Sequence, residues 1–368
     1  MWALDHFGRP KCVLYCADIV HISLFLSYIG TGMCDISLQE SFLLLICYGR
    51  DEFEVSPDSD CGAKYALFCF HECKIAILRT LGNRKVEDLP GHICQLRATS
   101  PSFAKRSEHI SDIHFRLQKF GVLKISLGFE DDNCDYLQQI IRNLHRQHGH
   151  GLPIDHSASR GWFWDVRPTQ ESIEGSYKAR SETANSFPWH TDCSYEAAPP
   201  RYFALQVLQP DRCNGGTLSI LKMDSLVDLL SEHTRSILCR PEFRIDVPPE
   251  FIKRDSERHI VGSLLSRSSS KGENFVNFEG RFREDIILPL TKDAKCAFEE
   301  LKSAVLGPEA AKHILDLTPD MLPRGSIILL DNRRWLHARN QVKDPKRHLR
   351  RVRWDACSFG PVGAFSGF

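Results

Sequence analysis

A histidine and an aspartate separated by one residue stand in the stretch FPWHTDCSYEAAPPRYF, as His190 and Asp192. On a β-strand, residues i and i+2 point to the same face, so this imidazole and this carboxylate could bind one metal ion side by side. A second histidine, His337 in DNRRWLHARN, could complete a set of two imidazoles and one carboxylate. Such a set leaves metal positions open and is typical of non-haem Fe(II) oxygenases. Alone, the pair is weak evidence, because a structural histidine beside an aspartate is common.

Two further motifs offer groups that bind anions. Gly215 and Gly216 let the backbone approach another group closely, and Thr217 after them has a hydroxyl group. The segment KRHLRRVRW begins nine residues after His337. If it is a strand, Arg347, Arg351 and Arg353 share one face. Guanidinium groups bind carboxylates in bidentate fashion, so this row would suit a dicarboxylate; the alternative is a solvated basic edge strand.

The order of WHTD, GGT, DNRRWLHAR and RHLRR resembles the taurine dioxygenase and clavaminate synthase-like superfamily over roughly residues 106–357. Members of that superfamily are Fe(II)- and 2-oxoglutarate-dependent oxygenases with a double-stranded β-helix, or jelly-roll, core. Within the superfamily, the chain resembles fungal enzymes of secondary metabolism. The resemblance implies that His190, Asp192 and His337 are the catalytic metal ligands. It also implies that Thr217 and Arg347 hold the far carboxylate of 2-oxoglutarate.

The second arginine of the family's R-x-x-x-R pattern corresponds to Arg351, which in relatives contacts cosubstrate or substrate. The gap after the distal histidine varies among relatives, so Arg347, Arg350, Arg351 and Arg353 all stay open as the cosubstrate anchor. The candidate substrate-binding residues are Arg353, Trp164 and Tyr177.

The resemblance implies an enzyme that uses Fe(II), 2-oxoglutarate and O2 to abstract hydrogen from an unactivated C–H bond. The expected substrate is a small molecule, an amino acid or an amino-acid-derived metabolite. The expected outcome is hydroxylation or oxidative cyclisation, including aziridine formation from L-valine, with succinate and CO2 as coproducts. Two alternatives stay open: the same chemistry on a macromolecule, and a non-catalytic jelly-roll binding protein.

Composition narrows the class of protein. The 368 residues are 42% hydrophobic and 26% charged, which is typical of a globular chain. The 47 basic and 47 acidic residues balance, whereas nucleic-acid binders are usually basic, so we expect no nucleic-acid partner. The 14 cysteines are too sparse for a disulfide scaffold and indicate a cytoplasmic protein. The apolar run 12–29 contains Asp18 and His21, which favours a buried element over a membrane or targeting segment. Composition does not predict the oligomeric state.

The chain falls into a Cys-rich region without an assigned role, residues 1–105, and an expected dioxygenase domain, residues 106–368. Apolar periodicity predicts one helix ending at Gly121, a second capped by Asp132 or Asn133 and ending at Gly149, and a third capped by Thr291. Short apolar segments bounded by Pro, Gly or Asn predict strands at 122–129, 202–208, 217–221, 243–247, 260–265 and 327–330. The predicted fold class is mainly β with flanking helices (α+β), with a jelly-roll core.

Overall fold

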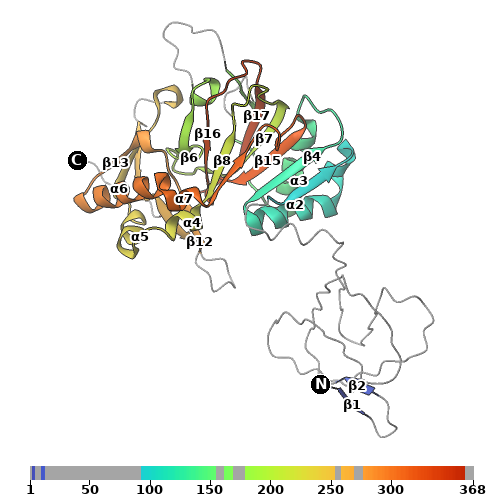
Figure 1. The fold of residues 1–368 in the computed structure, drawn as a ribbon, viewed down its shortest axis with the longest axis horizontal. Helices are drawn as coiled ribbons and strands as arrows, with labels where there is room; N and C mark the ends of the chain where they lie inside the picture. Colours follow the sequence, from blue (N-terminus) through green and yellow to red (C-terminus); the bar gives the residue numbers. More distant parts are fainter. Residues whose placement is uncertain are drawn as a thin grey trace, which may run out of the picture. The chain divides into compact units, whose positions relative to one another are not determined.

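The computed structural model describes Trp2–Leu4, Pro10–Cys12 and residues 93–154, 161–168, 179–252, 258–268 and 277–360 (Figure 1). The chain divides into two compact units, Met1–His92 and Ile93–Phe368. In the first unit, β1 (Trp2–Leu4) pairs antiparallel with β2 (Pro10–Cys12). Apart from Cys12, the apolar run 12–29 lies outside the described residues.

The second unit begins earlier than the expected boundary after residue 105. Strand β3 (Gln95–Ala98) pairs parallel with β4 (Val122–Leu127) in the largest sheet. Ala98 and Ala104 are buried in the core that this sheet shares with its covering helices. Residues 93–105 therefore fold with the segment that follows them.

Two sheets of mostly antiparallel strands form the centre of this unit. One has the order β3-β4-β15-β7-β17-β5 and the other β14-β8-β16-β6. The remaining strands of the first are β5 (Trp164–Val166), β7 (Pro200–Gln209), β15 (Ser326–Asp331) and β17 (His348–Ala356). The strands of the second are β6 (Phe187–His190), β8 (Leu218–Lys222), β14 (Ile314–Leu317) and β16 (Trp335–Arg339). This arrangement is the predicted jelly-roll core, and the mainly β fold class is confirmed.

Alternation along β7 explains why the sheets face each other. Phe203 and Leu205 point into a core that includes Ile220 of the opposite sheet. Tyr202 and Ala204 point the other way, into the core beneath the helices. Successive side chains of a strand point to opposite faces, and here both faces are covered. This strand therefore has a nearly continuous apolar sequence.

Helices α2 (Ser107–Phe120) and α3 (Asp135–His148) cover the outer face of the six-stranded sheet (Figure 1). They end as predicted at Gly121 and Gly149, with φ of 70° and 71°, a left-handed conformation that glycine adopts without steric cost. The predicted cap of α3 is wrong. Its first backbone N–H groups donate instead to the carboxylate of Asp131, at 2.9 and 3.1 Å.

A further layer inserted between β8 and β15 packs around its own apolar core. Its helices are α4 (Met223–Val227), α5 (Glu232–Leu238), α6 (Lys292–Leu306) and α7 (Pro308–Ala311). Its strands are β9 (Phe243–Asp246), β10 (His259–Gly262), β11 (Leu265–Ser268), β12 (Asn277–Gly280) and β13 (Ile287–Pro289). Short 3-10 helices occur at Pro101–Lys105, Arg180–Glu182, Pro249–Phe251 and Glu284–Ile286. The hydroxyl of Thr291 caps α6 as predicted, and within the described residues no helix has the length and apolar character to cross a membrane.

A buried histidine joins the helix layer to β17. The indole N–H of Trp354 donates to Nδ1 of His150 at 3.2 Å, and Nε2 of His150 lies 2.9 Å from Nδ1 of His114. An indole nitrogen only donates, so Nδ1 of His150 must be unprotonated. Burial above all, together with the nearby His114, lowers the pKa of His150 to about 4, although Asp355 opposes this effect.

Acid should therefore weaken the fold through His150. Its folded-state pKa of about 4 lies below the ordinary 6.5. Its contribution to stability is therefore complete above pH 6.5 and is lost as pH falls toward 4. At pH 5 the loss should be about 2 kcal/mol in the free energy of unfolding. Denaturant titrations at pH 7 and pH 5 should show this loss in the wild type and a smaller one in His150→Gln. The exposed His313→Gln should behave like the wild type, and equal losses in all three proteins would contradict the assignment.

Candidate metal centre

Three side chains that can bind a metal converge between the two sheets. Ligand atoms of His190, Asp192 and His337 all lie within 4.8 Å of one another, the only such group of His, Cys, Asp or Glu within the described part of the chain. His190 and His337 are direct partners in the pairing of β6 with β16. Nε2 of each histidine lies 3.8 Å from Oδ1 of Asp192. All three side chains are buried.

We predicted that His190 and Asp192 face the same side because they alternate along one strand. The structure gives a different reason for the position of Asp192. His190 is the last residue of β6, and Asp192 lies in the turn that follows. The next residue, Cys193, has a left-handed φ of 54°, which bends the chain away. The carboxylate faces the imidazoles because other residues hold the turn in place.

His190 has a fixed orientation and a defined protonation state. Its Nδ1 lies 2.8 Å from the carbonyl oxygen of Pro188 and donates to it, which leaves Nε2 facing Asp192. The ring of Phe187 stacks on the imidazole at 3.6 Å between centroids. Burial and the neighbouring His337 hold the pKa of His190 well below its ordinary value. His190 is therefore neutral, as a metal-binding imidazole must be.

Asp192 is kept ionised against the cost of burial. Burial opposes ionisation most strongly, but Arg351, His337 and Arg353 together hold the pKa of Asp192 well below its ordinary value. Nη1 of Arg351 lies 3.2 Å from Oδ1 of the carboxylate. Oδ2 of Asp192 and Nδ1 of His337 are buried, and neither has a hydrogen-bond partner among the described residues. Two imidazoles, one of them fixed as neutral, and one carboxylate suit Fe(II), so the residues present fit the implied metal.

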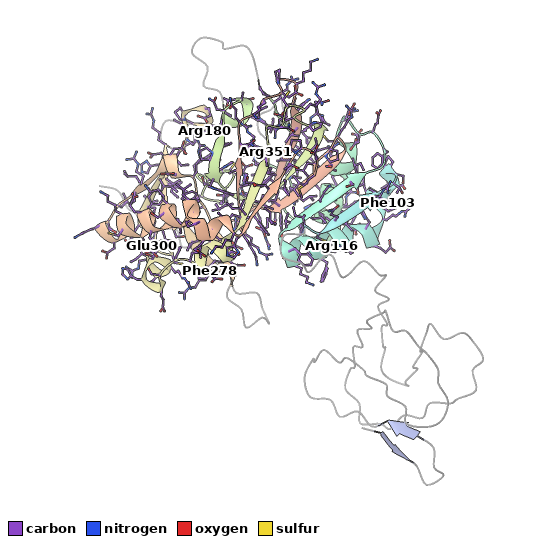
Figure 2. The ribbon with its side chains drawn as sticks, viewed as in Figure 1. Phe103, Arg116, Arg180, Phe278, Glu300 and Arg351 are labelled. Carbon is purple, nitrogen blue, oxygen red and sulfur yellow. The ribbon has the colours of Figure 1, made fainter. Side chains whose placement is uncertain are left out.

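The basic segment is an interior strand and not a solvated edge. Strand β17 lies between β7 and β5. Arg347, which precedes it, Arg351 and Arg353 are all buried, and Figure 2 shows Arg351 in the middle of the domain. Arg350 points the other way, where its Nε lies 3.0 Å from Asp165. This orientation removes Arg350 from the candidate anchors of the cosubstrate.

Arg347 lies against the Gly-Gly-Thr motif. A Cβ atom on Gly216, whose φ is +65°, would lie 2.6 Å from Nε of Arg347. Nη1 of Arg347 is buried without a hydrogen-bond partner among the described residues, and burial lowers the pKa of this guanidinium to about 9. The backbone N–H of Thr217, the next residue, donates to Asn340 at 2.8 Å. Gly216 thus leaves room for the guanidinium of Arg347 beside the residue that precedes Thr217.

Two of the three residues that we expected to contact the substrate, Arg353 and Trp164, lie within the described part of the chain. Nη1 of Arg353 donates to Sγ of Cys193 at 2.5 Å, directly after Asp192 in the chain. Trp164 is the register partner of Arg351 in the pairing of β5 with β17, so both side chains lie on the same face. Tyr177 lies outside the described residues.

Two cavities adjoin the candidate centre. A small one of about 30 Å³ is lined by His190, Asp192 and Arg351, among others. A larger one of about 600 Å³ shares His190 and Phe187 with it. Phe187 was not among the sequence candidates, although an aromatic residue three positions before His190 was a signal that could have been used.

The fold and the three converging side chains are typical of a jelly-roll oxygenase of the non-haem iron class. The family described as taurine catabolism dioxygenase TauD, TfdA family matches residues 144–353, which is more than half of the chain. The chain belongs to this family and is an oxidoreductase that uses Fe(II), 2-oxoglutarate and O2. Membership in this family favours an enzyme over the alternative of a non-catalytic binding protein.

Solved structures agree on the fold. The structure is similar to an asparagine oxygenase in complex with Fe(II), 2S,3S-3-hydroxyasparagine and succinate (TM-score 0.51, 16% identity, covering 71% of this chain and 93% of that one). It is also similar to the non-haem iron oxygenase OrfP in complex with Fe (TM-score 0.50, 18% identity, covering 68% and 81%). No curated protein matches the chain.

Proposed function

We propose that the chain is an oxygenase that removes hydrogen from an unactivated C–H bond of an amino acid or an amino-acid-derived metabolite. The observation that carries this proposal is the convergence of His190, Asp192 and His337 beside a buried row of arginines. In this assignment these three residues are the metal ligands. Iron and 2-oxoglutarate supply the oxidising chemistry when bound, with succinate and CO2 as coproducts.

Arg347 and Thr217 are the proposed holders of the far carboxylate of 2-oxoglutarate. Nη1 of Arg347 is buried without a partner in the described part of the chain and offers a charge-assisted hydrogen bond, and Thr217 follows Gly216, which Arg347 contacts. Arg351 is the proposed second cosubstrate contact, because it already lies against Asp192. Its ion pair keeps that carboxylate charged.

Charge balance favours a substrate that carries a carboxylate. The row of Arg347, Arg351 and Arg353 presents three positive charges, and the buried carboxylates of Asp192 and Asp211 beside it present two negative charges. Fe(II) and dianionic 2-oxoglutarate cancel each other, so the interior stays positive after both bind. A buried charge without compensation is costly, and the carboxylate of an amino acid would reduce this cost. Arg353 and Trp164 are the proposed substrate contacts within the described residues.

Hydroxylation is the proposed outcome, and oxidative cyclisation, including aziridine formation from L-valine, shares its first hydrogen abstraction. Two related structures hold hydroxylated amino acids: the asparagine oxygenase noted above, and OrfP with (3R,4R)-dihydroxy-L-Arg (TM-score 0.50, 15% identity, covering 71% and 86%). These ligands support amino acids as the first substrates to test.

The proposed oxygenase domain is the second unit, which contains the whole family match. The proposed location is the cytoplasm. The cysteines described within this unit, from Cys94 to Cys357, are free thiols, as a reducing compartment requires.

The proposal predicts a visible charge-transfer band when Fe(II) and then 2-oxoglutarate are added to the metal-free protein without oxygen. His190→Ala should lose the band, because it removes one of the three ligands. Asp192→Ala should lose succinate formation that depends on an added amino acid. His313→Ala, an exposed histidine, is the matched control and should keep both. Folded wild-type protein that contains iron but gives no band would refute the 2-oxoglutarate assignment.

The cosubstrate assignment predicts a specific effect of Gly216→Ala. The new methyl group would displace the guanidinium of Arg347, so the affinity for 2-oxoglutarate should fall about 10- to 100-fold. Fe(II) affinity should stay near that of the wild type. The measurement is a titration of the charge-transfer band with 2-oxoglutarate.

Gly149→Ala separates backbone strain from this contact. Gly149 has a similar φ of +71°, but an added Cβ would meet nothing within 4 Å. This control should lose stability and keep its affinity for 2-oxoglutarate. Equal losses of affinity in the two variants would exclude a specific role for the contact between Gly216 and Arg347.

A further inference from the structure

The side chain of Asn332 bonds to both backbone polar groups of Asp192. Its Oδ1 accepts a hydrogen bond from the N–H of Asp192 at 2.7 Å, and its Nδ2 donates to the carbonyl oxygen of Asp192 at 2.9 Å. Nδ2 also donates to the carbonyl oxygen of Pro200 at 2.9 Å. Asn332 is 1% exposed, so water does not compete for these bonds. A single side chain thus gives Asp192 the pair of bonds that a neighbouring strand would otherwise provide.

Asp192 needs such a partner because it lies beyond the end of β6. The residue before it, Thr191, is held by Phe282, to which its N–H donates at 2.7 Å. The residue after it, Cys193, turns away with its left-handed φ. Between these two points Asn332 fixes the backbone of Asp192. Buried backbone groups are nearly always paired, so these bonds hold the turn in one conformation.

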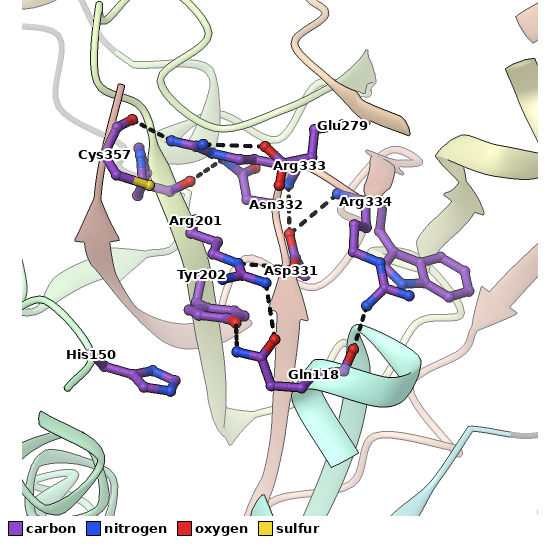
Figure 3. A network of polar contacts seen from close by, with 12 residues as sticks. Gln118, His150, Arg201, Tyr202, Glu279, Asp331, Asn332, Arg333, Arg334 and Cys357 are labelled. Atoms are coloured by element: carbon purple, nitrogen blue, oxygen red, sulfur yellow. Dashed lines mark hydrogen bonds and ion pairs between the residues drawn. The ribbon is translucent and has the colours of Figure 1, made fainter. Parts of the chain in front are cut away.

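Asn332 itself is held firmly. It lies in the turn between β15 and β16, which Figure 3 shows as a network of polar contacts. The buried carboxylate of Asp331 accepts from the backbone N–H groups of Arg333 and Arg334, at 3.1 and 3.3 Å, and pairs with Arg201 at 3.4 Å. The N–H of Asn332 donates to the carbonyl oxygen of Arg201 at 2.7 Å. The same turn leads directly into β16, which carries His337.

We infer that Asn332 is a positioning residue of the metal centre, which ties the backbone of Asp192 to the turn that leads to His337. The inference rests on the proposed metal role of these two residues. Arg351 contacts the carboxylate of Asp192, and Asn332 holds its backbone, so the ligand is fixed at both ends. A carboxylate and an imidazole from distant parts of the chain thereby keep a constant separation before the metal arrives.

The test is the affinity of the metal-free, full-length protein for Co(II), a spectroscopic substitute for Fe(II). Asn332→Ala should bind Co(II) about 10- to 100-fold more weakly, because loss of a group that orients a ligand typically costs that much. The Co(II) affinity of Asn332→Asp should lie between those of Asn332→Ala and the wild type, since a carboxylate can still accept from the N–H of Asp192 but cannot donate. The d–d spectrum of bound Co(II) should also change in Asn332→Ala.

Asn143→Ala is the matched control. Asn143 is also buried, at 7% exposure, and its Nδ2 donates to the carbonyl oxygen of Ala104 at 2.7 Å in the helix layer. This variant should lower Tm and leave Co(II) affinity and spectrum unchanged. Folded Asn332 variants with wild-type affinity, or an equal loss in Asn143→Ala, would overturn the inference. A wild-type chain that binds no Co(II) or Fe(II) would instead overturn the proposed function.

Hydrogen exchange of the wild type tests the inference even if the variants do not fold. The amide N–H of Asp192 should exchange slowly in the metal-free protein, because Asn332 holds it without help from a metal. Rapid exchange of this amide, with slow exchange of the β16 amides, would show that the turn is not fixed and would refute the inference.

Discussion

The ionised carboxylate of Asp192, held in the protein interior, is the constraint on which the rest of the site depends. Removing a charge from water is costly, and a buried ion pair is stable only when its partners are well placed. Arg351 supplies the opposite charge at 3.2 Å, and Asn332 supplies the hydrogen bonds of the backbone. These partners come from β17 and from the turn before β16. The two sheets must therefore face each other closely for the carboxylate to stay charged.

Strand β17 can supply a charge partner to the buried carboxylate of Asp192 because its two faces have different functions. The arginines at alternate positions point into the site, whereas Val352 and Trp354 pack beneath the helices. Arg350, on the outer face, is neutralised by Asp165. A segment that is strongly basic in sequence thus becomes an interior strand, because its positive charges are divided between an anion-binding face and an outer ion pair.

The sequence predicted the parts of the fold that follow from local patterns. A short apolar segment predicted β7, and glycines predicted the ends of α2 and α3, because both signals act within a few residues. The convergence of His190 with His337 could be predicted only from the order of the motifs along the chain. Asn332 was invisible because its partners, Asp192 and Pro200, lie more than a hundred residues away. An asparagine in a turn is ordinary in sequence, and only the fold shows what it holds.

The same charge distribution links ligand binding to stability. Without ligands, the buried carboxylates of Asp192 and Asp211 offset only part of the positive charge of Arg347, Arg351 and Arg353, so the folded state carries an electrostatic cost. An anion that binds the folded chain and not the unfolded one relieves this cost and stabilises the fold by mass action. The site that we propose, which attracts one carboxylate from the cosubstrate and one from the substrate, is therefore built at the expense of the stability of the unliganded protein. The hydrogen bonds of the Asp331–Arg334 turn act against this cost locally, because they hold Asn332, and through it the backbone of Asp192, without help from a ligand.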